Sequence, residues 1–392
     1  MKTNFSRLAA LGFILITLLG LISFSPATAQ VAESSLSYPK NGEIAYANTD
    51  SLYLPWTRKE AIIPIWIDLA NQHGGTYESI GKSSASQNWD IIAFQFGTTN
   101  KPGIMITAHL HGNEHYGYEV MYALANWLVS NDTTAKSILE NNYVIFVPVV
   151  DYRWARTNYN YQSGQYDDGS DLNSIGVDLN RNFAPSWTSN LTLQDHNQYG
   201  GIAADSEPET QALINAWEKY QPLIFWNLHQ GSTRVYTECT TTTAQENATL
   251  KKLKNILPTV TSNLNVTGPL FNFIVNTAYG MGYNGYGKGY AIDGAASHGV
   301  LGLMSELKTG WNYNDEIRAD LNSGETFKQA KVLFIALAQS TGTASPDSNS
   351  TESALPKQEA TFSPVNIALM VLIVLVAVSI GLAAYFVMGK YS

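Results

Sequence analysis

Cysteine and basic residues are scarce in this chain of 392 residues, and both shortages exclude whole classes of protein. Cys239 is the single cysteine, which excludes an internal disulfide and a zinc site with several cysteine ligands. Lys and Arg number 23 against 32 Asp and Glu, and this acidic balance predicts no nucleic-acid partner. Charged residues make up 14% of the chain and hydrophobic residues 45%, which argues against a disordered protein.

The N-terminal end has the pattern of a secretory signal peptide. Lys2 and Arg7 precede an uncharged apolar run from Leu8 to Phe24, and an Ala-x-Ala cleavage site follows at 27–29. We therefore predict a signal peptide at residues 1–29. An uncleaved N-terminal anchor is the alternative.

The C-terminal end predicts a membrane anchor. Residues 367–388 carry no charge and, at about 1.5 Å per helical residue, would span about 33 Å, enough to cross a bilayer. We predict a transmembrane helix at 365–388 and a short cytoplasmic tail at 389–392, with a removable lipid-anchor signal as the alternative. Residues 340–364 are rich in Ser, Thr and Pro and predict a flexible stalk.

Residues 30–339 have the pattern of one α/β domain. Short apolar runs predict strands at 89–96, 103–107, 143–150, 223–228 and 300–304. Helical spacing of apolar residues predicts helices at 56–72, 116–129, 206–220 and 324–339, the third opening with a capping box at Ser206–Glu209. This alternation predicts a mixed, mostly parallel sheet flanked by helices, with ligands bound beyond the carboxyl ends of its strands.

A histidine-rich segment follows the predicted strand at 103–107. His111, Glu114 and His115 match an inverted zincin motif, in which both histidines bind zinc from one helix. Alternatively, His111 and Glu114 are two metal ligands from a turn. The second interpretation is favoured because the segment directly follows a strand, and Gly112 and Asn113 are poor residues for a helix interior.

Two further polar residues follow or end predicted strands. His229 ends the apolar run at 223–228, and Glu306 follows the run at 300–304. Two histidines, one carboxylate and a spare glutamate are the set that a catalytic zinc with an open position requires. Such a zinc polarises a carbonyl and activates water, while the free carboxylate transfers the proton.

With these residues the chain resembles the zinc carboxypeptidases of the carboxypeptidase A type. Five motifs occur in the order found in that family: His111–Glu114, Gly176–Phe183, Tyr199–Thr210, His229 and Ser305–Leu307. The resemblance covers roughly residues 51–339. It implies a zinc carboxypeptidase-like fold and a peptidase with one zinc ion, and it disfavours the inverted zincin.

The resemblance also implies a role for each matching residue. The three zinc ligands are His111, Glu114 and His229. Glu306 matches the general base and acid, and Asn180 and Arg181 match the pair that holds the terminal carboxylate of the substrate. Arg156 matches the arginine that stabilises the oxyanion, with Arg153 as a rival.

Two positions relate to substrate recognition. Tyr286 fits best the mobile tyrosine of the family, although Tyr283 and Tyr290 compete for this role. Ile292 matches the base of the specificity pocket, where an apolar side chain favours an apolar or aromatic C-terminal residue. Asp167, Asp168 and Asp171 form an acidic loop that is either simply solvated or holds calcium.

Together these features predict a zinc metallocarboxypeptidase anchored in the cell membrane by one C-terminal helix, with its catalytic domain outside. Its expected substrates are the C-termini of peptides or proteins. Two alternatives remain open: a cell-wall peptide amidase on the same scaffold, and a non-catalytic receptor for peptide C-termini.

Overall fold

The computed structural model of the chain describes residues within the region predicted to form the α/β domain, and the first three residues of the predicted stalk. These are residues 33–39, 61–85, 88–112, 114–152, 159–160, 165–166, 173–184, 187, 199–231, 234–237, 248–266, 273–274, 289–307 and 324–342. They all belong to the first of two units, Met1–Gly342 and Thr343–Ser392. The predicted signal peptide, transmembrane helix and tail lie outside them, as does the stalk after residue 342.

No helix within the described ranges is both long and apolar enough to cross a membrane.

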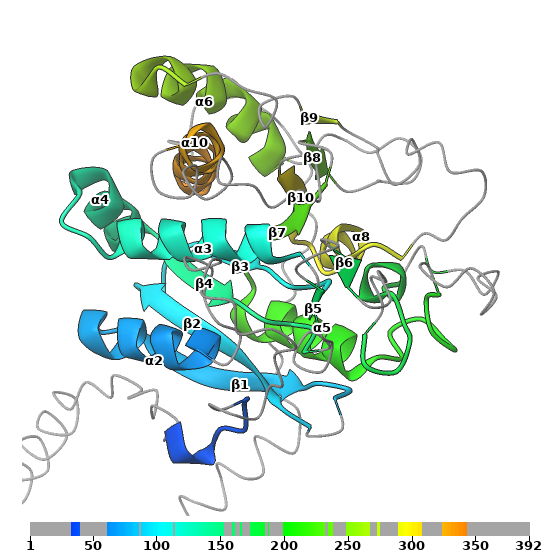
Figure 1. The fold of residues 1–392 in the computed structure, drawn as a ribbon. Coiled ribbons are helices and arrows are strands. Elements are labelled where there is room, and N and C mark those ends of the chain that lie inside the picture. The colour runs from blue at the N-terminus through cyan, green and yellow to red at the C-terminus, as the bar shows by residue number, and fades with distance from the viewer. Residues whose placement is uncertain are drawn as a thin grey trace, which may run out of the picture. The chain divides into compact units, whose positions relative to one another are not determined.

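An eight-stranded mixed sheet forms the centre of the described domain (Figure 1). Its order is β1 (Thr76–Lys82), β2 (Asp90–Gly97), β4 (Tyr143–Val147), β3 (Gly103–Thr107), β7 (Ile224–Gln230), β10 (Leu301–Leu307), β8 (Arg234–Thr237) and β9 (Phe273–Ile274). Strands β4, β3, β7 and β10 are parallel to one another, and β2 and β8 join them antiparallel on either side. The predicted mixed, mostly parallel sheet is confirmed. The carboxyl ends of β3, β7 and β10 share one edge.

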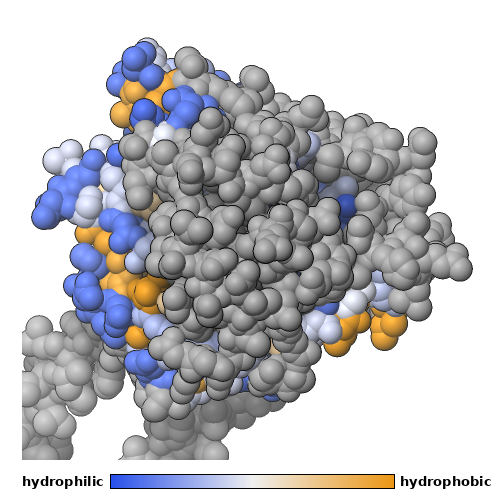
Figure 2. Space-filling model, in the orientation of Figure 1, coloured by the Kyte–Doolittle hydropathy of each residue, from blue (hydrophilic) through white to orange (hydrophobic). Residues whose placement is uncertain are grey.

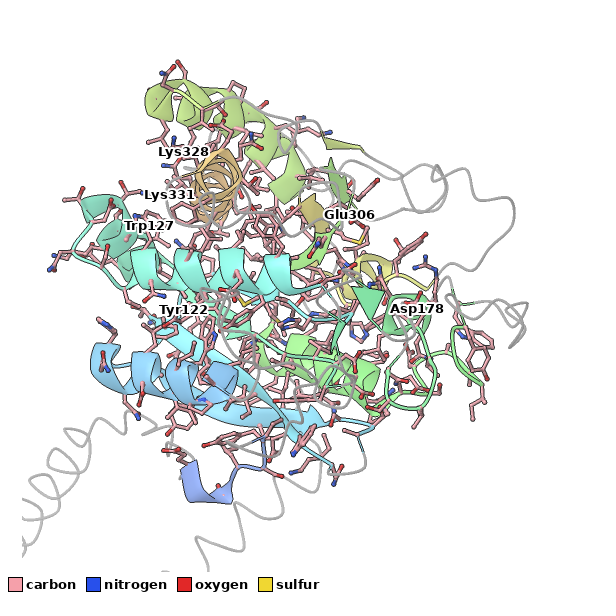
Figure 3. All side chains as sticks on the ribbon, in the orientation of Figure 1. Tyr122, Trp127, Asp178, Glu306, Lys328 and Lys331 are labelled. Atoms are coloured by element: carbon pink, nitrogen blue, oxygen red, sulfur yellow. The ribbon has the colours of Figure 1, made fainter. Side chains whose placement is uncertain are left out.

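Helices cover both faces of this sheet. The described helices are α2 (Ile62–His73), α3 (His115–Leu128), α4 (Thr133–Asn141), α5 (Pro208–Tyr220), α6 (Ala248–Leu264), α8 (Ala291–Ser297) and α10 (Glu325–Ser340). Two short 3-10 helices, η1 (Glu33–Ser35) and η5 (Leu179–Arg181), accompany them. A separate two-stranded sheet is formed by β5 (Tyr159–Asn160) and β6 (Gln165–Tyr166). Lys331 of α10 lies 4.3 Å from the ring centroid of Trp127 of α3 and joins these two helices (Figure 3). Hydrophilic residues lie over α4 and α6 in Figure 2, as expected for the outer sides of amphipathic helices.

Neighbouring residues of β7 show which helices lie on opposite faces. The ring of Phe225 lies 5.0 Å from that of Trp217 on α5, and the ring of Trp226 lies 6.4 Å from that of Phe334 on α10. Because successive side chains of a strand point to opposite faces, α5 and α10 cover opposite sides of the sheet.

Trp66 places α2 and α3 on the same face as α10. Its ring contacts Phe146 of β4 at 5.2 Å and Tyr122 of α3 at 5.8 Å. Phe146 and Trp226 both pair with Ile106 of β3, so their side chains point to one face. The sheet is therefore covered by α2, α3 and α10 on one side and by α5 on the other.

Helix α3 approaches the end of β7 closely. A Cβ atom added to Gly117 would lie 2.8 Å from the backbone oxygen of Leu228, so only glycine allows this packing. The approach brings the start of α3, which Glu114 precedes, against the end of β7 that carries His229. Packing of a helix on a strand thus assembles the site described below.

The predicted capping box before α5 is wrong. The helix begins at Pro208 with Glu207 at its N-cap, and no side chain caps it. The Ser206 hydroxyl instead donates to Glu207 Oε1 at 2.9 Å, and Glu209 Oε1 accepts from the backbone and hydroxyl of Ser84. The Glu209 carboxylate therefore binds Ser84, which is distant in the sequence, and not the N-terminal backbone of its own helix.

Candidate metal centre

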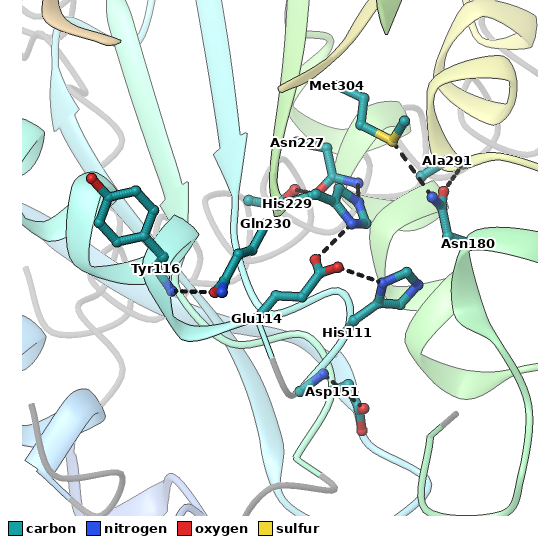
Figure 4. A network of polar contacts seen from close by, with 12 residues as sticks. His111, Glu114, Tyr116, Asp151, Asn180, Asn227, His229, Gln230, Ala291 and Met304 are labelled. Atoms are coloured by element: carbon teal, nitrogen blue, oxygen red, sulfur yellow. Dashed lines mark hydrogen bonds and ion pairs between the residues drawn. The ribbon is translucent and has the colours of Figure 1, made fainter. Parts of the chain in front are cut away.

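Three side chains that can bind a metal meet where β3 and β7 end (Figure 4). His111 and Glu114 lie between β3 and α3, and His229 lies on β7. Their ligand atoms all lie within 4.8 Å of one another, and the residues are only 6%, 6% and 1% exposed. His111 Nδ1 is 3.2 Å from Glu114 Oε1, and His229 Nδ1 is 2.8 Å from Glu114 Oε2.

A tight turn presents His111 and Glu114 together. The backbone N–H of Glu114 donates to His111 O at 3.1 Å, and Asp151 Oδ2 accepts from the N–H of Gly112 at 3.2 Å. Helix α3 begins only at His115, so His111 precedes the helix and the inverted zincin arrangement is excluded. His109 is buried, stacks on Tyr118 with ring centroids 5.2 Å apart, and is not part of the metal group.

The three side chains fit a zinc ion. Glu114 Oε2 is buried and accepts no hydrogen bond of good geometry from any described residue, although His229 Nδ1 lies beside it. Burial acts to raise the pKa of Glu114, but the facing His229 and His111 outweigh it and hold this pKa at about 2, so the carboxylate is ionised. Two imidazoles and one ionised carboxylate are a donor set of catalytic zinc sites.

Asp178, which is not among the predicted site residues, supports the ring of His111. His111 Nε2 lies 3.1 Å from Asp178 Oδ1, which also accepts from the N–H of Asn180 at 2.9 Å. Burial acts to raise the pKa of Asp178, but Arg181 and His111 together lower it, so the carboxylate stays ionised. An ionised carboxylate only accepts hydrogen bonds, so it keeps the proton of His111 on Nε2 and leaves the Nδ1 lone pair for a metal.

The predicted carboxylate-binding pair lies on η5, next to Asp178. Asn180 Oδ1 accepts from the N–H of Ala291 at 3.0 Å, which orients the amide so that its NH₂ group faces Met304 Sδ at 3.5 Å. Thioether sulfur is a weak acceptor, so an incoming carboxylate can replace it. The side chain of Arg181 is 14% exposed, and its Nη1 donates to the backbone oxygen of Asn180 at 2.9 Å.

Glu306 lies at the same edge of the sheet as the metal group. It pairs in register with His229 across β10 and β7. A Cβ atom on Gly231 would overlap Glu306 Oε2, so the carboxylate lies against the residue that follows β7. Figure 3 shows Glu306 and Asp178 on the same side of the domain, away from Tyr122 and Trp127 on α3. Glu306 thus lies at the strand ends that carry the metal group, but it is not one of the three grouped ligands.

Ile292 lies in an apolar cluster next to Asn180. It is 1% exposed and packs with Tyr236, Tyr290 and Met304, all of them buried. Met304 of this cluster faces the amide of Asn180, and the backbone of Ala291, which precedes Ile292, donates to it, so the cluster adjoins the carboxylate-binding pair.

Several predicted site residues lie outside the described ranges. They are Arg156 and its rival Arg153, Tyr286 and its rival Tyr283, and the acidic residues Asp167, Asp168 and Asp171. Tyr290, the other rival, is described: it is buried, and its ring centroid lies 4.7 Å from the guanidinium carbon of Arg181.

Comparisons with known proteins identify the family and its fold. Residues 65–322 match the family described as zinc carboxypeptidase. Carboxypeptidase A from Helicoverpa armigera is 19% identical, with a TM-score of 0.54 over 72% of this chain and 74% of that one. Bovine thrombin-activatable fibrinolysis inhibitor, solved with a tick carboxypeptidase inhibitor, is 15% identical, with a TM-score of 0.54 over 73% of this chain and 97% of that one. No curated protein sequence matches significantly.

The family match covers most of the domain and includes every residue of the metal group. The protein is therefore a zinc-dependent metallopeptidase that uses one zinc ion, and its fold is that of the carboxypeptidases. The chain belongs to the zinc carboxypeptidase family.

Proposed function

We propose that the protein is a membrane-anchored carboxypeptidase, with its catalytic domain outside the cell, that removes single residues from the C-termini of peptides or proteins. The position of Asp178 carries the proposal. Its carboxylate is 3.1 Å from His111 Nε2 and 3.8 Å from Arg181 Nη1. It thus holds a predicted zinc ligand and the predicted carboxylate-binding arginine at a fixed spacing, as cleavage of the last peptide bond requires.

Glu306 is proposed as the general base and acid. His111, Glu114 and His229 would hold the zinc ion, which polarises the scissile carbonyl and lowers the pKa of water when bound. Glu306 accepts a proton from the attacking water and donates it to the leaving nitrogen. Its place opposite His229 in the register of β10 and β7 supports this role.

Asn180 and Arg181 are proposed to bind the terminal carboxylate. The planar guanidinium matches a carboxylate with two parallel hydrogen bonds, and the oriented amide of Asn180 adds a third donor. Arg156 is proposed to stabilise the oxyanion, with Arg153 as its rival, and Tyr286 to close over the substrate. The apolar cluster around Ile292 supports a preference for apolar or aromatic C-terminal residues.

The anchoring part of the proposal rests on the sequence. The apolar run of residues 8–24 and the charge-free run of 367–388 are the supporting features. A signal peptide at 1–29, a catalytic domain at 30–339, a stalk at 340–364 and a single span at 365–388 would place the enzyme on the outer surface of the membrane.

Peptides with free and blocked C-termini test the proposal. We expect the full chain to release single amino acids from peptides that end in a free carboxylate, and to cleave the same peptides far more slowly when they end in an amide. A zinc chelator should stop the release. Cleavage of muropeptides with no cleavage of ordinary peptides would favour the cell-wall amidase, and binding without any cleavage would favour the receptor.

Replacement of Gly231 by alanine tests the position of Glu306. The added Cβ would overlap Glu306 Oε2 and push the carboxylate out of place. We expect hydrolysis to fall by roughly 10- to 100-fold, because small misplacements of reacting groups carry penalties of this order. The zinc dissociation constant should not change, since none of the three predicted ligands contacts the new methyl group. Full activity in Gly231→Ala would contradict the placement of Glu306.

A further inference from the structure

Asn227 connects β3 to the second histidine of the metal group. It lies two residues before His229 on β7, so both side chains point to the same face of the sheet. Its Nδ2 lies 2.8 Å from His229 Nε2, and its Oδ1 accepts from the hydroxyl of Thr107 at 2.9 Å. Asn227 and Thr107 are both completely buried and pair in register across the sheet. Figure 4 shows Asn227 next to the ring of His229, with Glu114 on the other side of that ring.

This arrangement has a consequence for the proton of His229. An amide NH₂ group only donates, so a neutral ring that faces it must accept at Nε2 and carry its proton on Nδ1. Nδ1 is the atom that faces Glu114 at 2.8 Å and that would bind the metal. A nitrogen that carries a proton has no lone pair for a metal, so the proton must move to Nε2 when zinc binds.

A half-turn of the Asn227 amide resolves this conflict. The turn places Oδ1 against the N–H at Nε2 of His229 and places Nδ2 against the hydroxyl of Thr107. A threonine hydroxyl accepts as readily as it donates, so both side-chain hydrogen bonds of Asn227 can be kept with the amide reversed. His111 needs no such change, because its Nε2 already faces the carboxylate of Asp178.

We infer that Asn227 is a positioning residue for zinc: its amide oxygen holds the proton of His229 on Nε2 in the zinc-bound protein, and Thr107 accepts the reversed amide. The inference goes beyond the proposed function and rests only on His229 as a zinc ligand. Partners behind metal-bound histidines commonly contribute a factor of about 10 to 100 in metal affinity.

The test is the zinc affinity of two Asn227 variants of the full chain. It is measured at pH 8 by competition with a chromophoric chelator. Asn227→Leu has a similar size and no acceptor, so we expect the zinc dissociation constant to rise by about 10- to 100-fold. Asn227→Asp only accepts hydrogen bonds, so we expect affinity equal to or higher than that of the wild type. This second variant keeps the polar contact to Thr107 and also serves if the leucine variant folds poorly.

Asn142→Leu is the matched control. Asn142 is a buried asparagine whose Oδ1 accepts from the Thr341 hydroxyl, but it lies outside the metal group. We expect its zinc affinity to equal that of the wild type. Unchanged zinc affinity in Asn227→Leu, or an equal loss in Asn227→Asp, would overturn the inference. Because no substrate is present, neither result depends on peptide hydrolysis.

Discussion

Glu306→Gln is expected to lower the rate of peptide hydrolysis by about 10³-fold or more, because general acid–base catalysis contributes about 10²- to 10⁴-fold and both proton transfers pass through this carboxylate. Glutamine has the same shape but cannot accept a proton from water at neutral pH. The measurement is kcat on a peptide with a free C-terminus.

Two further results separate catalysis from structure in this variant. The zinc dissociation constant should be unchanged, because Glu306 pairs with His229 in register but is not among the three grouped ligands. Glu140→Gln on the exposed side of α4 should keep full activity and serves as the matched control. If Glu306→Gln retained more than a small fraction of the wild-type kcat, Glu306 could not be the general base.

Arg181→Met is expected to remove the requirement for a free C-terminus. Removing one partner of a buried charge pair costs about 2–5 kcal/mol, so kcat/KM should fall by roughly 30-fold to several thousandfold on peptides with a free carboxylate. Peptides with a C-terminal amide offer no charge to the guanidinium, so their slow cleavage should not change. The ratio of kcat/KM for the two peptides is the measurement, and a ratio that equals that of the wild type would contradict the assignment.

Arg181 also stabilises Asp178, so its replacement needs a control. The 3.8 Å ion pair between them contributes to the low pKa of the carboxylate that supports His111. Arg181→Lys keeps the positive charge but loses the two-pronged geometry of the guanidinium. We expect zinc affinity close to that of the wild type in this variant, with a loss of kcat/KM smaller than in Arg181→Met.

The ends of apolar runs made the three metal ligands and Glu306 candidates, and the resemblance to the zinc carboxypeptidases then assigned their roles. His111, Glu114, His229 and Glu306 all follow or end apolar runs, and the carboxyl ends of parallel strands meet at one edge of a sheet. Asp178 was missed because its role depends on how η5 folds back onto the β3–α3 turn. No spacing in the sequence specifies that contact.

Some elements escaped prediction for physical reasons that are visible in α6. Leu250, Leu253, Leu257 and Val260 of this helix are buried and form an apolar stripe with helical spacing. Pro258 lies inside the helix, and from the sequence alone a proline at this position predicts a helix break. The helix nevertheless continues through Pro258 and packs against α10, as expected where tertiary context overrides a local preference. The predicted capping box before α5 is wrong for a related reason, because Glu209 bonds to the distant Ser84 and does not cap its own helix.

Stepwise return of zinc to the stripped protein tests the central claim most directly. Zinc is removed with a chelator, the chelator is removed, and amino-acid release from a free-carboxylate peptide is measured as zinc is added. We predict no release from the stripped protein and a linear recovery that ends at one zinc ion per chain. Release that persists without zinc, or that fails to return when one equivalent is bound, would contradict it.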